Sequence, residues 1–194
     1  MNIKYGTFVA LDLELNQPSG KIIQIGIAIG NIHDSPEQYI TRQWYINPGE
    51  PISEFITQLT GITNEDIDNF SVEYISFVDQ LQQVLAKYTP FINPVTWGCG
   101  DLISLRSQIE ASGIEFPCFG KRWIDVKTWY TLYMFSRNRS PKGGLKSAMS
   151  EFKMKFTGSA HQADVDAANT LALFFKFLKR QSEIEGLINK IKEI

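Results

Sequence analysis

Two acidic residues near the N-terminus, Asp12 and Glu14, lie in an otherwise apolar run, TFVALDLEL. Residues two apart on a β-strand project from the same face, so these carboxylates would lie side by side. Two like charges on a buried strand repel each other and lose their hydration, so something must compensate for them. Either the strand has already emerged into water, or the pair holds a divalent cation such as Mg²⁺ or Mn²⁺. The other face carries Leu11, Leu13 and Leu15, which favours the cation.

A third acid, Asp101, follows a short apolar segment and the break Gly98-Cys99-Gly100. Aspartate is a good helix N-cap, and that role alone would explain its position. A metal ligand at the same place would lie at the end of a neighbouring strand, where ligand sites of open α/β sheets are found. Both roles are compatible with the local sequence.

A histidine and a fourth acid, His161 and Asp166, bracket the start of a long predicted helix in HQADVDAANT. The chain has two histidines, and the other, His33, lies in a loop without other reactive groups nearby in sequence. His161 could be an ordinary loop residue, with Asp164 and Asp166 favouring the helix N-terminus. Histidine is also the side chain that exchanges a proton near neutral pH without special tuning, so His161 is a candidate general base.

Three strands are predicted in the first 46 residues. Thr7–Leu15 is apolar on both faces at its start, which is typical of a central strand. Lys21–Gly30 is β-branched and alternates with small residues, and Gln38–Ile46 alternates as an edge strand with one wet face does. The short connections predict an antiparallel meander.

The remainder of the chain is mainly helical in pattern, with one further short apolar strand at Phe91–Trp97. Strands in a meander followed by alternating helices and strands predict an α/β domain, a mixed sheet covered by helices. The predicted helices are Ile52–Thr60, which ends at Gly61, then Ser71–Tyr88, one starting near Asp101, Trp123–Phe135 after a short strand, Gly143–Phe152 and Gln162–Arg180.

At 194 residues the chain fits a single domain, and we expect it to comprise residues 1–180. Residues 181–194 are predicted to form a separate amphipathic helix after a weak break, packed on the same domain. Two cysteines are too few for a disulfide framework or a zinc pattern, and no apolar run is long enough to span a membrane. The N-terminal residues do not resemble a secretory signal, so we expect a cytoplasmic protein without membrane contact.

The charge of the chain is uneven. The net charge is −2, which argues against a strongly basic, sequence-independent nucleic-acid coat. Residues 121–155 nevertheless hold nine Lys or Arg and two acids, a net +7 on an acidic remainder. Such a stretch is either an electrostatic footprint for a phosphate backbone or a solvated surface.

Taken together and in order, the acids and the histidine resemble the DEDDh family of 3′–5′ exonucleases. The chain has D-x-E on its first strand, a lone Asp at a middle helix, and H-x4-D at a late helix. Supporting segments are similar too. They are Leu59-Thr60-Gly61-Ile62-Thr63, Thr96-Trp97-Gly98-Cys99-Gly100-Asp101, which resembles the W-G-x-x-D of the histone-mRNA-type branch, and the approach to His161 through Gly158-Ser159-Ala160.

The resemblance implies a ribonuclease-H-like fold and a metal-dependent 3′–5′ exonuclease. It implies that two divalent ions, Mg²⁺ or Mn²⁺, lie about 4 Å apart, with His161 as general base. The substrate would be single-stranded DNA or RNA with a free 3′ end, and the products nucleoside 5′-monophosphates. The expected metal ligands are Asp12, Glu14, Asp101 and Asp166.

Three further residues are expected to contact the terminal nucleotide: Leu15, Asn16 and Thr60. Many family members carry Thr directly after the second acid, and this chain has Leu15-Asn16 instead. The departure affects the expected nucleotide contacts and leaves the metal ligands intact. The sequence does not predict an oligomeric state or separate DNA from RNA, although the W-G-x-x-D segment favours RNA.

Three alternatives remain at this point. A structure-specific nuclease of the same fold would also use clustered acids, but H-x4-D favours the exonuclease arrangement. A non-catalytic binding relative would be expected to lack at least one of the five site residues, and all five are present. A metal-dependent phosphatase would hydrolyse a bare p-nitrophenyl ester and leave oligonucleotides intact.

Overall fold

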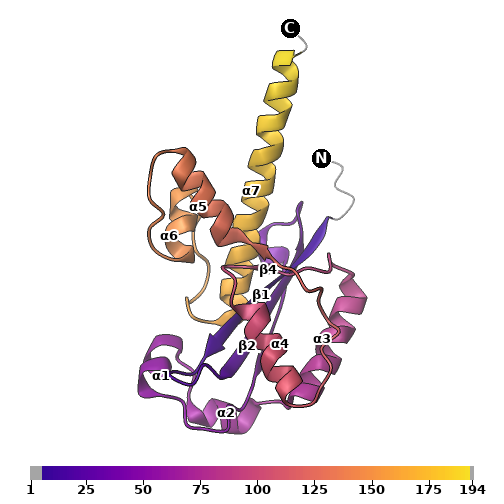
Figure 1. Cartoon of the computed structure of the whole chain (residues 1–194), viewed down its shortest axis with the longest axis vertical. Helices are drawn as coiled ribbons and strands as arrows, with labels where there is room; N and C mark the ends of the chain where they lie inside the picture. The colour runs from indigo at the N-terminus through magenta and orange to yellow at the C-terminus, as the bar shows by residue number, and fades with distance from the viewer. Residues whose placement is uncertain (1–5, 193–194) are drawn as a thin grey trace.

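The computed structural model describes residues 6–192 and consists of a twisted sheet with helices on both faces (Figure 1). Within the described residues the sheet has five strands in the order β3-β2-β1-β4-β5. The strands are β1 (Thr7–Leu15), β2 (Ile22–Asn31), β3 (Ile40–Tyr45), β4 (Val95–Thr96) and β5 (Ile124–Asp125). The first three form the predicted antiparallel meander, with β1 central and β3 at the edge, while β4 and β5 run parallel to β1.

The helices follow the predicted order, with shifts at their ends. They are α1 (Glu54–Thr60), α2 (Asn64–Phe70), α3 (Tyr74–Tyr88), α4 (Asp101–Ala111), α5 (Val126–Ser136), α6 (Leu145–Glu151) and α7 (Ala163–Lys192), with a 3₁₀ turn at Pro36–Gln38. Gly61 ends α1 in the left-handed conformation with a φ of 78°, as its place after the helix predicts. Sequence patterns did not predict α2, which is short and has a single buried side chain, Ile67.

The alternation of side chains along β1 divides the core in two. Val9, Leu11 and Leu13 face α3 and α4, while Phe8 and Ala10 face α7 with α5 and α6 beyond it. Because side chains alternate along a strand, Asp12 and Glu14 continue the second of these faces. The two acids therefore lie beneath the start of α7 and not in the larger apolar layer.

Two predicted segments are shorter than their patterns indicated. Phe91–Trp97 is apolar throughout, yet only Val95 and Thr96 pair as a strand. Trp123–Phe135 was predicted as helix from its first residue, but Ile124 and Asp125 pair as β5 and the helix begins at Val126. In both cases pairing with the neighbouring strand sets the boundary, which local periodicity does not reveal.

The expected break near residue 181 is wrong, because α7 is one continuous helix from Ala163 to Lys192. Gln181, Ser182 and Glu183 contain no Gly or Pro, so nothing in the sequence stops the helix there. The expected packing of this segment on the domain is not seen either, because residues 183–189 are exposed and the helix projects beyond the body (Figure 1). No described helix is both long and apolar enough to cross a membrane.

Candidate active site

The first two acids lie on β1 where it crosses under α7. In the pairing of β1 with β2, Asp12 is opposite Gly26 and Glu14 is opposite Gln24. Glu14 is 8% exposed although it carries a carboxylate, so it is buried without having emerged into water. The alternative that the strand is already solvated at this point therefore fails for Glu14.

Asp101 is brought to the same place by β4 and the loop after it. Because β4 runs parallel to β1, both strands deliver their following residues to the same edge of the sheet. The loop is held by Asp125, whose Oδ1 accepts hydrogen bonds from the N–H of Gly98 and the N–H of Thr128, both 3.1 Å away. Asp101 is the first residue of α4 and its side chain makes no capping bond, so the N-cap interpretation is wrong.

The last two site residues come from the turn that opens α7. His161 adopts the left-handed conformation, with a φ of 63°, and its backbone N–H donates to Oδ2 of Asp166 at 2.9 Å. This bond fixes the turn and leaves the imidazole exposed. Asp166 thus has two possible functions, as the acid that orders the turn and as a metal ligand.

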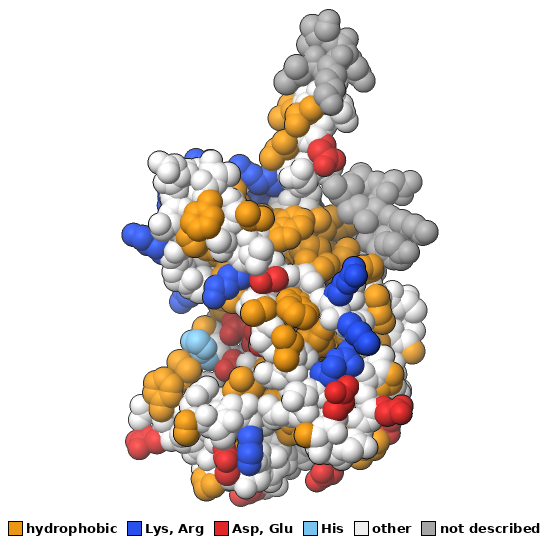
Figure 2. Space-filling model, in the orientation of Figure 1, with side chains coloured by type: hydrophobic (Ala, Val, Ile, Leu, Met, Phe, Trp, Pro, Cys, Tyr) orange, Lys and Arg blue, Asp and Glu red, His pale blue; other side chains and the backbone are white. Residues whose placement is uncertain are grey.

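The five residues converge. Ligand atoms of Glu14, His161 and Asp166 lie within 4.8 Å of one another. Burial raises the pKa of Asp12 well above its usual value, and the charges of Asp101, Asp166 and Glu14 raise it further. Figure 2 shows acidic side chains in a hollow of the surface beside a histidine.

The other three acids share this environment. Burial, with the charges of Asp166 and Asp101, raises the pKa of Glu14 to about 7. Burial raises the pKa of Asp101 to about 7. Burial also raises the pKa of Asp166, while the backbone N–H and the charge of His161 oppose that shift. Each carboxylate is therefore costly to ionise as long as the cluster holds only its own charges.

A divalent cation fits this donor set. The ion pairs in the described part of the chain are Lys21–Glu50, Arg106–Glu110 and Arg139–Glu151, so no Lys or Arg neutralises the four site acids. Carboxylate oxygens are the ligands that Mg²⁺ and Mn²⁺ prefer. A bound cation would offset the mutual repulsion that raises the pKa values.

Residues outside the predicted set hold α7 over the acids. The Oε1 of Gln24, a fully buried side chain of β2, accepts a hydrogen bond of 2.8 Å from the N–H of Ala163, and its Nε2 donates to Oε1 of Gln43. At Gly26, a Cβ atom would lie 2.1 Å from the backbone of Ala163. The available signal was a polar residue and a glycine inside the apolar run KIIQIGIAIG.

Two of the three expected nucleotide contacts have structural roles. Asn16 is 2% exposed; its amide donates to Oε1 of Glu50 and the carbonyl of Pro51, and its oxygen accepts from the N–H of Ser53. These bonds occupy both amide hydrogens and the oxygen, so the side chain orders the loop before α1. Whether Asn16 also contacts substrate stays a prediction.

Thr60 ties the end of α1 to the start of α7. It is buried, its hydroxyl donates to the carbonyl of Ile56 and accepts from the N–H of Ile62, and its own carbonyl accepts from Nε2 of Gln162 at 2.8 Å. Leu15 is half-buried against the α3–α4 layer. Their contacts with nucleotide also stay predictions.

The sequence pattern of the Exonuclease family matches residues 9–174. That span includes all five site residues. The chain belongs to this exonuclease family. The match confirms the resemblance to DEDDh 3′–5′ exonucleases that the order of the acids and the histidine indicated.

Similar proteins agree with this assignment. ERI1 exoribonuclease 2 of Danio rerio is 32% identical over 149 residues, which are 66% of this chain and 26% of that protein. DNA polymerase III PolC-type of Streptococcus sanguinis is 28% identical over 202 residues, 97% of this chain and 12% of that protein. The chain thus spans about a quarter or less of the length of these relatives.

Among solved structures, the nuclease domain of 3′hExo, a DEDDh family member bound to rAMP, superimposes with a TM-score of 0.76. The alignment covers 93% of this chain and 95% of that one, at 19% identity. At this identity the likeness shows the fold, which is the ribonuclease-H-like α/β fold that the sequence predicted.

Proposed function

We propose that this exonuclease-family chain is a divalent-metal-dependent 3′–5′ exonuclease that releases nucleoside 5′-monophosphates from single-stranded RNA. The observation that carries the proposal is the convergence of four carboxylates and one histidine from β1, α4 and the start of α7, with no basic side chain of the described residues to neutralise them. Such a cluster favours a cation and, through it, a phosphodiester.

Asp12, Glu14, Asp101 and Asp166 would hold two divalent ions. When bound, the ions supply a nucleophile at neutral pH by lowering the pKa of a water and stabilise the charge on the phosphate and on the leaving 3′ oxygen. The chain's own residues do the rest. The imidazole of His161 accepts the proton of the attacking water at a ring nitrogen, for which it must lie within about 3 Å of that water.

Asp166 serves this step a second time through the backbone. Its bond to the N–H of His161 fixes the turn, so the imidazole is presented at the rim of the hollow and not folded back along α7. Gln24 and Thr60 anchor the same turn from below, through Ala163 and Gln162. A general base held from three directions loses little freedom when substrate arrives.

RNA is proposed as the substrate on two grounds. One relative is named an exoribonuclease, and the nuclease domain of 3′hExo was solved with an adenosine ribonucleotide. The PolC-type relative acts as the reason for a DNA arm in the experiment. Free 3′ ends follow from the 3′–5′ direction of the DEDDh family.

The test uses 5′-labelled single-stranded RNA and DNA of one sequence, in linear and circular form. We expect linear RNA to shorten one nucleotide at a time with release of 5′-monophosphates, EDTA to abolish this, and Mg²⁺ or Mn²⁺ to restore it. Asp12→Asn should be inactive, and Asp79→Asn, an exposed acid of α3, should behave as wild type.

Several results would contradict the proposal. Turnover that persists in EDTA would exclude the metal mechanism, and cleavage of the circular substrate would indicate the structure-specific nuclease. Hydrolysis of p-nitrophenyl phosphate with oligonucleotides left intact would indicate the phosphatase. Equal or faster shortening of DNA would restrict the proposal to the reaction and remove the preference for RNA.

A further inference from the structure

The last turns of α7 carry apolar side chains that nothing in the described chain covers. Figure 1 shows this part of the helix projecting beyond the sheet and beyond α5 and α6. Ile184 is 41% exposed, Leu187 61% and Ile188 45%. A helical segment without tertiary contacts is marginal in water, and exposed apolar side chains grouped on one face mark an interaction surface.

These side chains form one stripe that continues into a groove. Leu187 and Ile188 follow Ile184 by three and four residues, and Phe177 precedes it by seven, which is the spacing of a helix-pairing seam. Phe177 and Ile184 line a groove of about 320 Å³ between α7 and α5. The α5 side of the groove consists of Trp129, Leu132, Tyr133 and Ser136, and Trp129 and Leu132 are themselves exposed.

The sequence of this segment is complementary to itself when its direction is reversed. It reads Glu183-Ile184-Glu185-Gly186-Leu187 and then Ile188-Asn189-Lys190-Ile191-Lys192. Reversal about the midpoint between Leu187 and Ile188 exchanges acid with base and apolar with apolar. The matched positions are Leu187 with Ile188, Glu185 with Lys190, Ile184 with Ile191, and Glu183 with Lys192.

We propose that two copies of this chain form a dimer in which the two α7 helices pair antiparallel about a twofold axis between Leu187 and Ile188. In a twofold interface each contact occurs twice, residue i with j and j with i, which is the symmetry of the matched positions. A parallel pair would place Glu183 and Glu185 against their own copies. Charges that flank a helix seam select the partner and its direction, so the antiparallel pair is the one chosen.

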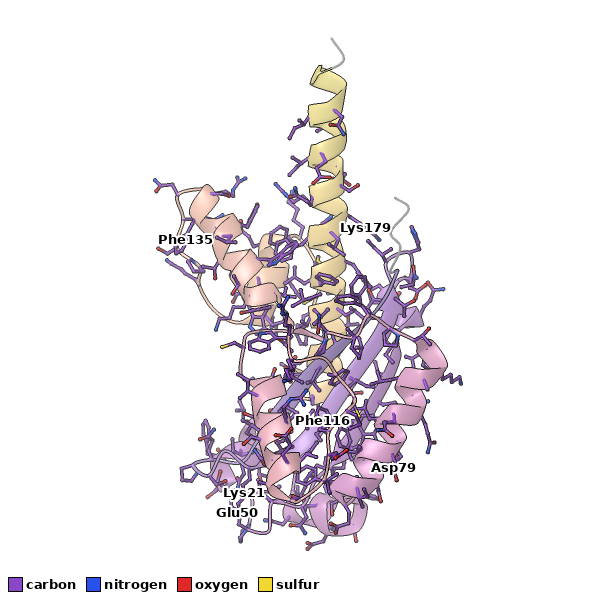
Figure 3. All side chains as sticks on the ribbon, turned by 45° about the vertical axis from the view of Figure 1, so that its right-hand side comes forward. Lys21, Glu50, Asp79, Phe116, Phe135 and Lys179 are labelled. Carbon is purple, nitrogen blue, oxygen red and sulfur yellow. The ribbon has the colours of Figure 1, made fainter. Side chains whose placement is uncertain are left out.

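The groove supplies area that the helix ends alone lack. A stable interface buries about 1,600 Å² in total, and two short helical segments bury less than that. In the antiparallel arrangement the end of the partner's helix passes Ile184 and lies along the α5–α7 groove, covering Trp129 and Leu132. Phe135 on α5 and Lys179 on α7 mark the two helices that flank this face in Figure 3.

The dimer face is remote from the acids. Asp166 lies at the first turns of α7, and Leu187 follows at about 1.5 Å of helix per residue, which places them about 30 Å apart along the axis. Pairing at this end therefore leaves the hollow of the active site open. Substitutions on the dimer face are expected to change the molecular mass in solution and not the turnover of a short oligonucleotide.

Charge reversal tests the proposal directly. The mass of the full chain is measured by sedimentation velocity over a concentration series. Wild type should change from monomer to dimer as concentration rises. Glu183→Lys/Glu185→Lys should be monomeric, and Lys190→Glu/Lys192→Glu should be monomeric as well. A chain with all four substitutions should regain the dimer, because the charges again face their opposites.

The matched control is Asp79→Lys/Glu115→Lys, which makes the same charge change at exposed positions outside the proposed face and should remain dimeric (Asp79 is labelled in Figure 3). Leu187→Glu, which changes no acid–base pair, should also give a monomer. Circular dichroism and turnover of a short oligonucleotide verify that each variant is folded. A wild-type chain that stays monomeric at every concentration overturns the proposal, and so does a four-substitution variant that stays monomeric while wild type dimerises.

Discussion

At His161 the backbone and the side chain have separate tasks. The residue adopts a φ of 63°, a conformation that side-chain-bearing residues rarely adopt, and its N–H is bound to Asp166. Asn and Asp tolerate this conformation better than most residues. A substitution to Asn can therefore remove the base while it keeps the turn, which separates chemistry from architecture.

We expect His161→Asn to lower the turnover number by roughly 10²–10⁴-fold while oligonucleotide affinity stays near that of wild type. Single-turnover kinetics give the rate, and fluorescence anisotropy in Ca²⁺ gives the affinity. His33→Asn is the matched control, because His33 is also exposed and lies outside the site. A fully active His161→Asn would return His161 to the role of an ordinary loop residue.

The four acids also make the stability of the metal-free protein depend on pH. In the folded state the pKa of Glu14 is raised from 4.5 to about 7 and that of Asp101 from 3.8 to about 7. Between about pH 4 and pH 7 the folded chain therefore binds protons that the unfolded chain has released. Stability must fall as pH rises through this window, because the unfolded state binds fewer protons.

In EDTA, the melting temperature measured by calorimetry should decrease from about pH 4.5 to pH 7, after allowance for other titrating groups by comparison with variants. Glu14→Gln and Asp101→Asn should each flatten the decrease, whereas Glu115→Gln, at an exposed position, should leave it unchanged. Mg²⁺ should raise the melting temperature most at the upper end of the window. A melting temperature indifferent to pH in EDTA would contradict the coupling of these acids.

At the scale of elements, the decisive contact is between β2 and the first turn of α7. Gly26 lies opposite Asp12 in the sheet, and a side chain there would meet the backbone of Ala163 and Asp164 at 2.1 Å. The glycine thus lets the helix approach the strand closely enough for Asp166 to join Asp12 and Glu14. Gln24, two residues earlier on the same face, then bonds the helix N-terminus.

Gly26→Ala should force α7 away from β2. We expect a loss of about 1–3 kcal/mol or more in the free energy of unfolding, because the atoms in the way belong to the backbone and cannot turn aside. The rate should fall by about 10²-fold, since a displacement near 1 Å misplaces His161 and Asp166.

The measurements are urea unfolding and single-turnover kinetics. Gly144→Ala is the control, because Gly144 has a negative φ of −95° and open space around it. It should change the free energy of unfolding by no more than about 0.5 kcal/mol. Equal behaviour of the two variants would show that the close approach at Gly26 does not position the site.

At the scale of the whole molecule, the basic stretch of residues 121–155 surrounds one side of the acidic hollow. Figure 2 shows basic side chains on the α5–α6 side of it. The structure changes which of them are free. Arg139 forms a two-pronged ion pair with Glu151, and Arg137 lies over the ring of Tyr133. Lys127, beside Gly98 in the loop that leads to Asp101, is a stronger candidate than the sequence indicated.

Lys127→Ala/Lys142→Ala/Lys146→Ala should weaken binding about equally across sequences. Each lost phosphate contact flattens the salt dependence of affinity by about 0.7 in log–log slope, or about 2 for all three. Affinity is measured at several salt concentrations in an Asp12→Asn background. Lys87→Ala/Lys176→Ala/Lys179→Ala, three exposed lysines of α3 and α7, should leave the slope unchanged. If both triples behave alike, the stretch is a solvated surface.

The sequence by itself determined what depends on neighbours along the chain. The bounds of β1, the antiparallel meander, the end of α1 at Gly61 and the identity of the five site residues all follow from alternation, turn residues and ordered motifs, which act over a few positions. The family resemblance then linked those motifs to a fold and a chemistry.

Tertiary structure decided which groups remain free to act. Asn16 and Thr60 are consumed by hydrogen bonds to distant segments, Arg139 by Glu151, while Gln24 and Gly26 gain a role at the site only because α7 is laid across β2. The end of α7 keeps a bare apolar face because the domain does not reach it. Hydrogen bonds, ion pairs and burial are settled between residues far apart in the chain, so local sequence patterns specify them only after the fold has brought those residues together.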